Sequence, residues 1–203
     1  MTPIDLIALV GGFVAWALVN LVASTRLAGS GLWWYRVSGL VEGAAAGVIG
    51  LRTDDAAWVA LGVLWILAKT WWVPAILARR FESSERYGVR AAGTPRIFLG
   101  SALVLGVLWW VAGPLGVPLA ALVAAFWVMA GRRELWVQAV MLLEAEIALG
   151  FLVVWGHAAP AVGDVLDVLE VLATAALLTW LGRTAQARFT TMPTSDDFTA
   201  LKG

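Results

Sequence analysis

Ionisable side chains occur inside stretches of this sequence that are otherwise almost entirely apolar. Glu42, Lys69 and Glu144 each lie near the middle of such a stretch, with few other polar residues around them. A charge at the centre of a bilayer costs at least about 3 kcal/mol, so such residues usually line an ion or proton path or pair with one another. The pattern therefore predicts a membrane protein that moves charge.

The composition agrees with a chain that lies in lipid. Apolar residues make up 61% of the 203 positions and charged residues only 14%, whereas soluble domains average about 45–50% and about 25%. The net charge is zero, so the charge balance does not indicate nucleic acid as a partner. There is no cysteine and a single histidine, His157. We therefore expect no metal, no cofactor and no catalytic residue in this chain.

Seven stretches have the length and composition of membrane-spanning helices, which need about 20 largely apolar residues. They cover residues 4–24, 32–51, 56–77, 97–112, 117–130, 135–156 and 165–181. Gly113-Pro114-Leu115-Gly116 joins the two short stretches in the middle, and such residues favour a tight turn. The predicted fold class is an all-α integral membrane protein with about seven transmembrane helices. One helical domain, 1–189, precedes a polar tail, 190–203.

The basic residues predict the orientation of this bundle. An odd number of helices places the two termini on opposite sides of the membrane. Arg52 then lies on one side and Lys69 inside the membrane, while the remaining twelve of the fourteen basic residues share the other side. Because cytoplasmic loops are rich in Lys and Arg, we expect the N-terminus outside and the C-terminus in the cytoplasm. The expected location is the cytoplasmic (inner) membrane of a bacterium or archaeon, as a multi-pass protein.

Glu42, Lys69 and Glu144 are expected at similar depth on three different helices. An apolar environment disfavours the charged form of a carboxyl or an amine, so such groups can exchange protons near neutral pH, as a proton relay requires. The alternative is a buried Glu–Lys ion pair that only locks the helices together. Both interpretations remain open from the sequence.

Further acidic residues lie near these groups or in the last apolar stretch. Glu146 follows Glu144 by two positions, so the two side chains point about 200° apart on a helix. We expect one to face the bundle interior and the other a partner protein or a water-filled crevice. Asp164, Asp167 and Glu170 share one helix face. The first two suit a helix N-terminus, whereas Glu170 lies about a turn deeper.

Several short motifs resemble, in the same order, one family of membrane subunits. They are AKTWWVP at 68–74, RRELWVQ at 132–138 leading into LLEAEI at 142–147, LDVL at 166–169, and DDFTALKG at 196–203. Together they resemble the component E subunit of hydrogenase-4 and formate hydrogenlyase complexes. That subunit is a relative of the small K subunit of respiratory complex I and of the C subunit of Mrp antiporters. The resemblance extends over most of the chain from residue 68 onward.

The resemblance implies a membrane-arm subunit of a group 4 nickel–iron-hydrogenase-like or complex-I-like redox complex. The family's proton-path glutamate would correspond to Glu144, and its lysine to Lys69. The implied partners are antiporter-like pump subunits and a quinone- or hydrogenase-module anchor subunit. Two departures stand out: Ala145-Glu146 replaces the family's Asn-Gly, and Glu170 occupies a place that is usually apolar.

We therefore expect a non-catalytic subunit that contributes to a proton or Na⁺ translocation path. Glu144 and Lys69 would form the central relay, and Glu42 and Glu170 would take up or release the ion. The full set of candidate path residues is Glu144, Lys69, Glu42, Glu146, Glu170 and Asp167. The alternatives are a purely structural linker of such a complex, an Mrp-type cation/proton antiporter subunit, or an independent small transporter.

Overall fold

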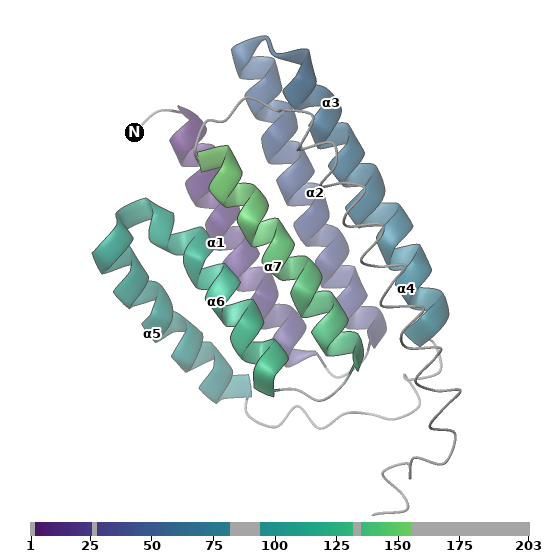
Figure 1. Ribbon diagram of the computed structural model, residues 1–203, viewed down its shortest axis with the longest axis vertical. Coiled ribbons are helices and arrows are strands. Elements are labelled where there is room, and N and C mark those ends of the chain that lie inside the picture. The colour runs from purple at the N-terminus through teal and green to yellow at the C-terminus, as the bar shows by residue number, and fades with distance from the viewer. Residues whose placement is uncertain (1–2, 26–27, 82–93, 132–134, 156–203) are drawn as a thin grey trace, which may run out of the picture.

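The computed structural model describes residues 3–25, 28–81, 94–131 and 135–155, which form a bundle of α-helices (Figure 1). The all-α fold class is confirmed for these residues, which contain no strand. The α-helices are α1 (Pro3–Ser24), α2 (Ala28–Thr53), α3 (Ala56–Trp65), α4 (Val73–Phe81), α5 (Thr94–Ala112), α6 (Gly116–Gly131) and α7 (Leu135–Trp155). A π-helix, η1 (Ile66–Trp72), joins α3 to α4, and a 3₁₀-helix, η3 (Gly113–Leu115), joins α5 to α6.

Three helical stretches among these residues are long and apolar enough to cross a membrane. They are Ile4–Ser24, Ala56–Ala78 and Arg96–Ala130. In each stretch, half or less of an apolar 18-residue window is buried within the bundle, so much of its apolar surface is left for lipid. This supports a membrane protein, and the number of seven spans stays a prediction. The predicted stretch 165–181 and the tail 190–203 lie outside the described residues.

The chain folds back on itself between α5 and α6, as the sequence predicts. Gly113 has φ +59°, which favours glycine, and Pro114 starts the short η3 turn. The two helices then pack against each other. The 35-residue apolar stretch Arg96–Ala130 is therefore a helical hairpin and not one long helix.

Four helices form the centre of the bundle: α1, α2, α6 and α7. Helix α7 packs against the other three, and the rod made of α3, η1 and α4 flanks α2 on one side. Helix α5 flanks α6 on the other side (Figure 1). The largest apolar core lies among the central helices and includes Val19, Ala121, Val140 and Phe151.

Helices α2 and α3 approach each other closely because glycines face one another. A Cβ built on Gly43 would lie 2.6 Å from the Gly62 carbonyl oxygen, which is closer than real side chains come. The Asp55 carboxylate accepts a hydrogen bond from the Ala57 N–H at 2.9 Å and caps the start of α3. This contact fixes the direction in which α3 leaves the turn and runs back along α2.

The rod from Ala56 to Phe81 contains one widened turn. Pro74 has no N–H and cannot complete an ordinary helical hydrogen bond to the carbonyl four residues before it. The preceding segment, Ile66–Trp72, forms a π-helix, and the Val73 N–H bonds to the Ala68 carbonyl five residues back. π-Helices are rare and occur frequently at functional sites. Lys69 lies in the middle of this one.

Candidate functional site

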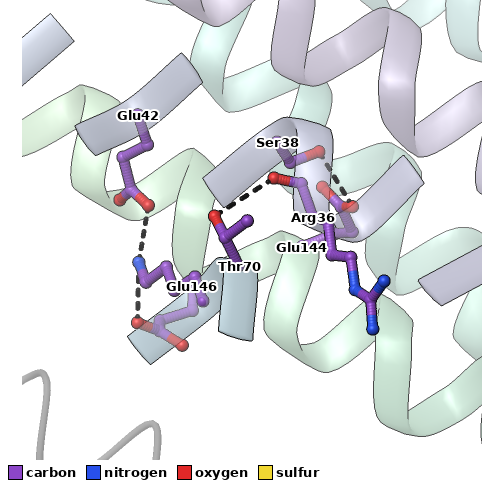
Figure 2. A network of polar contacts seen from close by, with 7 residues as sticks. Arg36, Ser38, Glu42, Thr70, Glu144 and Glu146 are labelled. Atoms are coloured by element: carbon purple, nitrogen blue, oxygen red, sulfur yellow. Dashed lines mark hydrogen bonds and ion pairs between the residues drawn. The ribbon is translucent and has the colours of Figure 1, made fainter. Parts of the chain in front are cut away.

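The Lys69 amine is held between two carboxylates inside the bundle (Figure 2). Its Nζ lies 2.6 Å from Glu42 Oε2 on α2 and 3.1 Å from Glu146 Oε1 on α7. It also lies 5.0 Å from the centre of the Trp65 ring, a distance at which the aromatic face attracts a cation. Only 1% of the lysine side chain is exposed. Three helical elements thus converge on one positive charge.

Glycines make room for this ion pair. A Cβ at Gly150 on α7 would overlap Glu42 Oε1, and a Cβ at Gly39 on α2 would lie 2.6 Å from Lys69 Cβ. Because neither position carries a side chain, α2 can pack closely against both η1 and α7. The Glu42 carboxylate is fully buried as a result.

Glu144 forms a second polar contact between α2 and α7. Its side chain is fully buried, and the Ser38 hydroxyl donates a hydrogen bond to Glu144 Oε1 at 3.0 Å. The other carboxylate oxygen, Oε2, has no hydrogen-bond partner within the described part of the chain. Buried polar atoms usually have a partner, and an ordered water often provides it. Glu144 therefore has one oxygen available for a further hydrogen bond.

The two glutamates of α7 reach different neighbours, as expected from their spacing. Glu144 meets Ser38 and is not exposed, whereas Glu146 meets Lys69 and keeps 29% of its side chain exposed. On α2, Ser38 and Glu42 are four residues apart and lie on the same face. This face of α2 therefore contacts Glu144 through Ser38 and Lys69 through Glu42.

A backbone contact holds η1 against α2 beside the cluster. The Thr70 hydroxyl donates to the Arg36 carbonyl oxygen at 3.4 Å (Figure 2). Thr70 follows Lys69 directly, so this contact and the Lys69–Glu42 ion pair fix adjacent residues of the π-helix on the same neighbour. The Lys69 amine is thus positioned by its own ion pair with Glu42 and by the hydrogen bond of the next residue, Thr70.

The cluster contains three carboxyl groups, Glu42, Glu144 and Glu146, and one amine, Lys69. If all four groups were ionised, negative charge would exceed positive charge in a place that water reaches poorly. A proton on one of the carboxyls reduces this imbalance. Chemically, the arrangement can hold a proton and offers several neighbouring groups that can accept it.

The structure brings together four of the six residues predicted from the sequence: Glu42, Lys69, Glu144 and Glu146. The other two, Asp167 and Glu170, lie outside the described residues. Neither Ser38 nor the π-helix is among the features predicted from the sequence. Ser38 could have been found from its position one helical turn before Glu42, whereas the π-helix has only Pro74 as a local signal.

Metal ligation and known relatives give no further assignment. Among the described residues, no group of three or more His, Cys, Asp or Glu side chains is arranged to hold a metal ion. Comparisons with protein-family models, with curated proteins and with solved structures returned no match.

Proposed function

We propose that the chain is an integral membrane subunit that contributes a proton or Na⁺ path to a larger redox-driven complex. The observation that carries the proposal is the Lys69 amine between Glu42 and Glu146, with the buried Glu144 two residues before Glu146 on α7. Ionisable groups inside membrane helices are costly and mark ion pathways in most cases. Three of them, Lys69, Glu42 and Glu146, form ion pairs, and the fourth, Glu144, is hydrogen-bonded to Ser38 one turn before Glu42.

The cluster suits stepwise proton transfer. Lys69 has two carboxylate partners at hydrogen-bonding distance, so a proton can be passed to either without a large movement of the amine. Glu144 lies deeper, and Glu146 opens to the side of the described bundle. Glu144 and Lys69 would form the central relay, Glu42 would connect them, and Glu146 would link the cluster to its surroundings. Asp167 and Glu170 would extend the path from the last predicted helix.

The proposal includes seven membrane-spanning helices with the N-terminus outside and the C-terminus in the cytoplasm. Three spanning stretches support a membrane location, and the distribution of basic residues supports the orientation. The chain would lie in the cytoplasmic membrane of a bacterium or archaeon. It would hold no cofactor and catalyse no reaction alone.

A larger complex is proposed for two reasons. The motifs around Lys69 and Glu144 resemble those of component E subunits of hydrogenase-4 and formate hydrogenlyase complexes. In addition, the Glu146 side chain is 29% exposed on the described bundle, and a neighbouring subunit would continue the path there. The partners would be antiporter-like pump subunits and an anchor subunit of a quinone- or hydrogenase-type module, as in group 4 nickel–iron hydrogenases or complex I.

One structural observation favours a second candidate function. The Lys69–Glu42 pair is short and almost fully buried, as expected if the charges only lock η1 to α2. The chain would then be a structural linker of the same complex. The sequence is also compatible with an Mrp-type antiporter subunit and with an independent small transporter.

Purification of the tagged full-length chain from native membranes in mild detergent tests the proposal, with the companions identified by mass spectrometry. We expect a large antiporter-like subunit together with a nickel or iron–sulfur subunit. Recovery with cation/proton antiporter subunits and no redox protein would favour the Mrp-type function. Recovery of the chain alone as a homo-oligomer would contradict the proposal and favour an independent transporter.

A further inference from the structure

Tyr35 is a fully buried residue of α2 that the proposed path does not yet include. It lies three residues before Ser38 and seven before Glu42, so all three share one face of the helix. Its side chain belongs to the core formed with Leu32, Leu77 and Trp136. A Cβ on Gly31 would lie 2.6 Å from the Trp136 ring, so the start of α2 lies against the start of α7. Tyr35 therefore lies between the buried cluster and this end of the bundle.

The Tyr35 hydroxyl has no hydrogen-bond partner among the described residues. The carboxyl groups of Glu146, Glu144 and Glu42 all act on it electrostatically, Glu146 most strongly. Buried tyrosine hydroxyls usually find a partner, and Glu144 Oε2 is a second buried atom without one. Both atoms belong to residues on the facing sides of α2 and α7. Buried waters typically bridge such otherwise unsatisfied groups.

We propose that Tyr35 is a positioning residue of the proton path: its hydroxyl holds water against Glu144 Oε2 and connects the cluster toward the end of the bundle where α2 and α7 begin. This inference rests on the proposed function and names the group next to Glu144 in the path. The titratable groups that act on the hydroxyl are Glu146 and Glu144 on α7 and Glu42 on α2, and Lys69 on η1 is paired with Glu42 and Glu146.

On the C-terminal side of Glu42, the surroundings of α2 are apolar and tightly packed. Beyond Glu42, Ala46 and Ile49 form a second core with Trp58, Leu61 and Trp65. The contact of Gly43 with the Gly62 backbone leaves no space for water between α2 and α3 at that level. Within the described residues, Tyr35 and Ser38 therefore provide the polar continuation from the cluster along α2. The loops predicted at the end of the bundle where α2 and α7 begin carry most of the basic residues of the sequence.

Replacing Tyr35 by Phe tests the inference because it removes only the hydroxyl and keeps the ring. The matched control is Ser101→Ala, which removes another buried hydroxyl, bound to Asn20 on α1 at 2.9 Å and outside the cluster. Both variants of the full-length chain are compared with Glu144→Gln in native membranes. Thermal unfolding of each purified variant reports whether the fold is kept.

The first readout is the infrared difference spectrum between acid and alkaline pH. The band that disappears in Glu144→Gln is assigned to the C=O stretch of the Glu144 carboxyl group. In Tyr35→Phe we expect this band to move to higher frequency because a hydrogen bond to the carboxyl is lost, and in Ser101→Ala we expect it unchanged. A merely structural hydroxyl would not move this band.

The second readout is the rate of proton transfer by the complex. We expect it to fall about fivefold in Tyr35→Phe, which is the effect of losing one hydrogen bond.

The outcomes separate this inference from the proposed function. A shifted band together with slower transfer supports the role of Tyr35. An unshifted band in Tyr35→Phe, or no band that Glu144→Gln removes, overturns it even if Glu144→Gln abolishes transport. Transport that is unchanged in Glu144→Gln overturns the proposed function, and the role of Tyr35 in a path is overturned with it.

Discussion

The Lys69 amine lies 2.6 Å from Glu42 Oε2, with both side chains at most 1% exposed. The same amine lies 3.1 Å from Glu146 Oε1, so one buried positive charge balances two carboxylates. Any change to one member of this group alters the electrostatic environment of the others. A single substitution of Lys69, Glu42 or Glu146 is therefore expected to change the stability of the whole group.

Replacing Lys69 by Met keeps an unbranched side chain but removes the charge. Glu42 then stays buried beside Glu146 without a cation, and breaking a buried pair in this way costs about 3–5 kcal/mol. We expect the free energy of unfolding in detergent to fall by about this amount. Adding Glu42→Gln to Lys69→Met should recover part of the loss, because the uncompensated charge is removed as well. Glu42→Gln alone completes the comparison. A loss in the double variant equal to the sum of the losses in the two single variants would contradict the ion pair.

Replacing Gly43 by Ala should separate α2 from α3. The new Cβ would lie 2.6 Å from the Gly62 carbonyl oxygen, and such overpacking costs about 1–3 kcal/mol. Gly47→Ala is the matched control, one turn further along α2, because its Cβ would meet no atom within 4 Å. We expect Gly47→Ala to be neutral or to gain up to about 1 kcal/mol from helix propensity. Thermal unfolding measures both, and equal stability of the two variants would contradict the close contact.

Single cysteines test the proposed orientation, since the chain has no cysteine of its own. Cysteine at Asp54, an exposed residue between α2 and α3, should react with a membrane-impermeant maleimide added outside intact cells. Cysteine at Ser84, in the basic stretch between the third and fourth predicted helices, should react only after the membrane is opened. The reverse pattern would place the N-terminus in the cytoplasm.

Much of the bundle could be predicted from the sequence because its signals are local. The apolar stretch 56–77 corresponds to the spanning stretch Ala56–Ala78, and Gly113-Pro114 ends one helix where the structure turns. The depth of Glu42 and Lys69 in their stretches was enough to suggest that they meet. These features depend on chain length, hydrophobicity and turn residues, which are read directly from the sequence.

The partners of each buried group could not be predicted in the same way. Whether Lys69 reaches one carboxylate or two depends on the widened turn of η1 and on the missing side chains at Gly39 and Gly150. These are properties of how three helices pack. The spacing of Ser38 from Glu42 places both on one face of α2, but that Ser38 donates a hydrogen bond to Glu144 depends on how α2 and α7 pack.

The measurement that tests the central claim most directly is proton translocation by the complex carrying Glu144→Gln. Glutamine keeps the shape of the side chain and can still accept the Ser38 hydrogen bond, but it cannot take up and release a proton. In inverted membrane vesicles, acidification is followed with a pH-sensitive dye while electron transfer and subunit composition are measured in parallel. We expect translocation to fall about 100-fold or more, the usual size for loss of a positioned proton-transfer group, with electron transfer and assembly retained. Unchanged translocation would contradict the account, and loss of assembly alone would favour the structural linker.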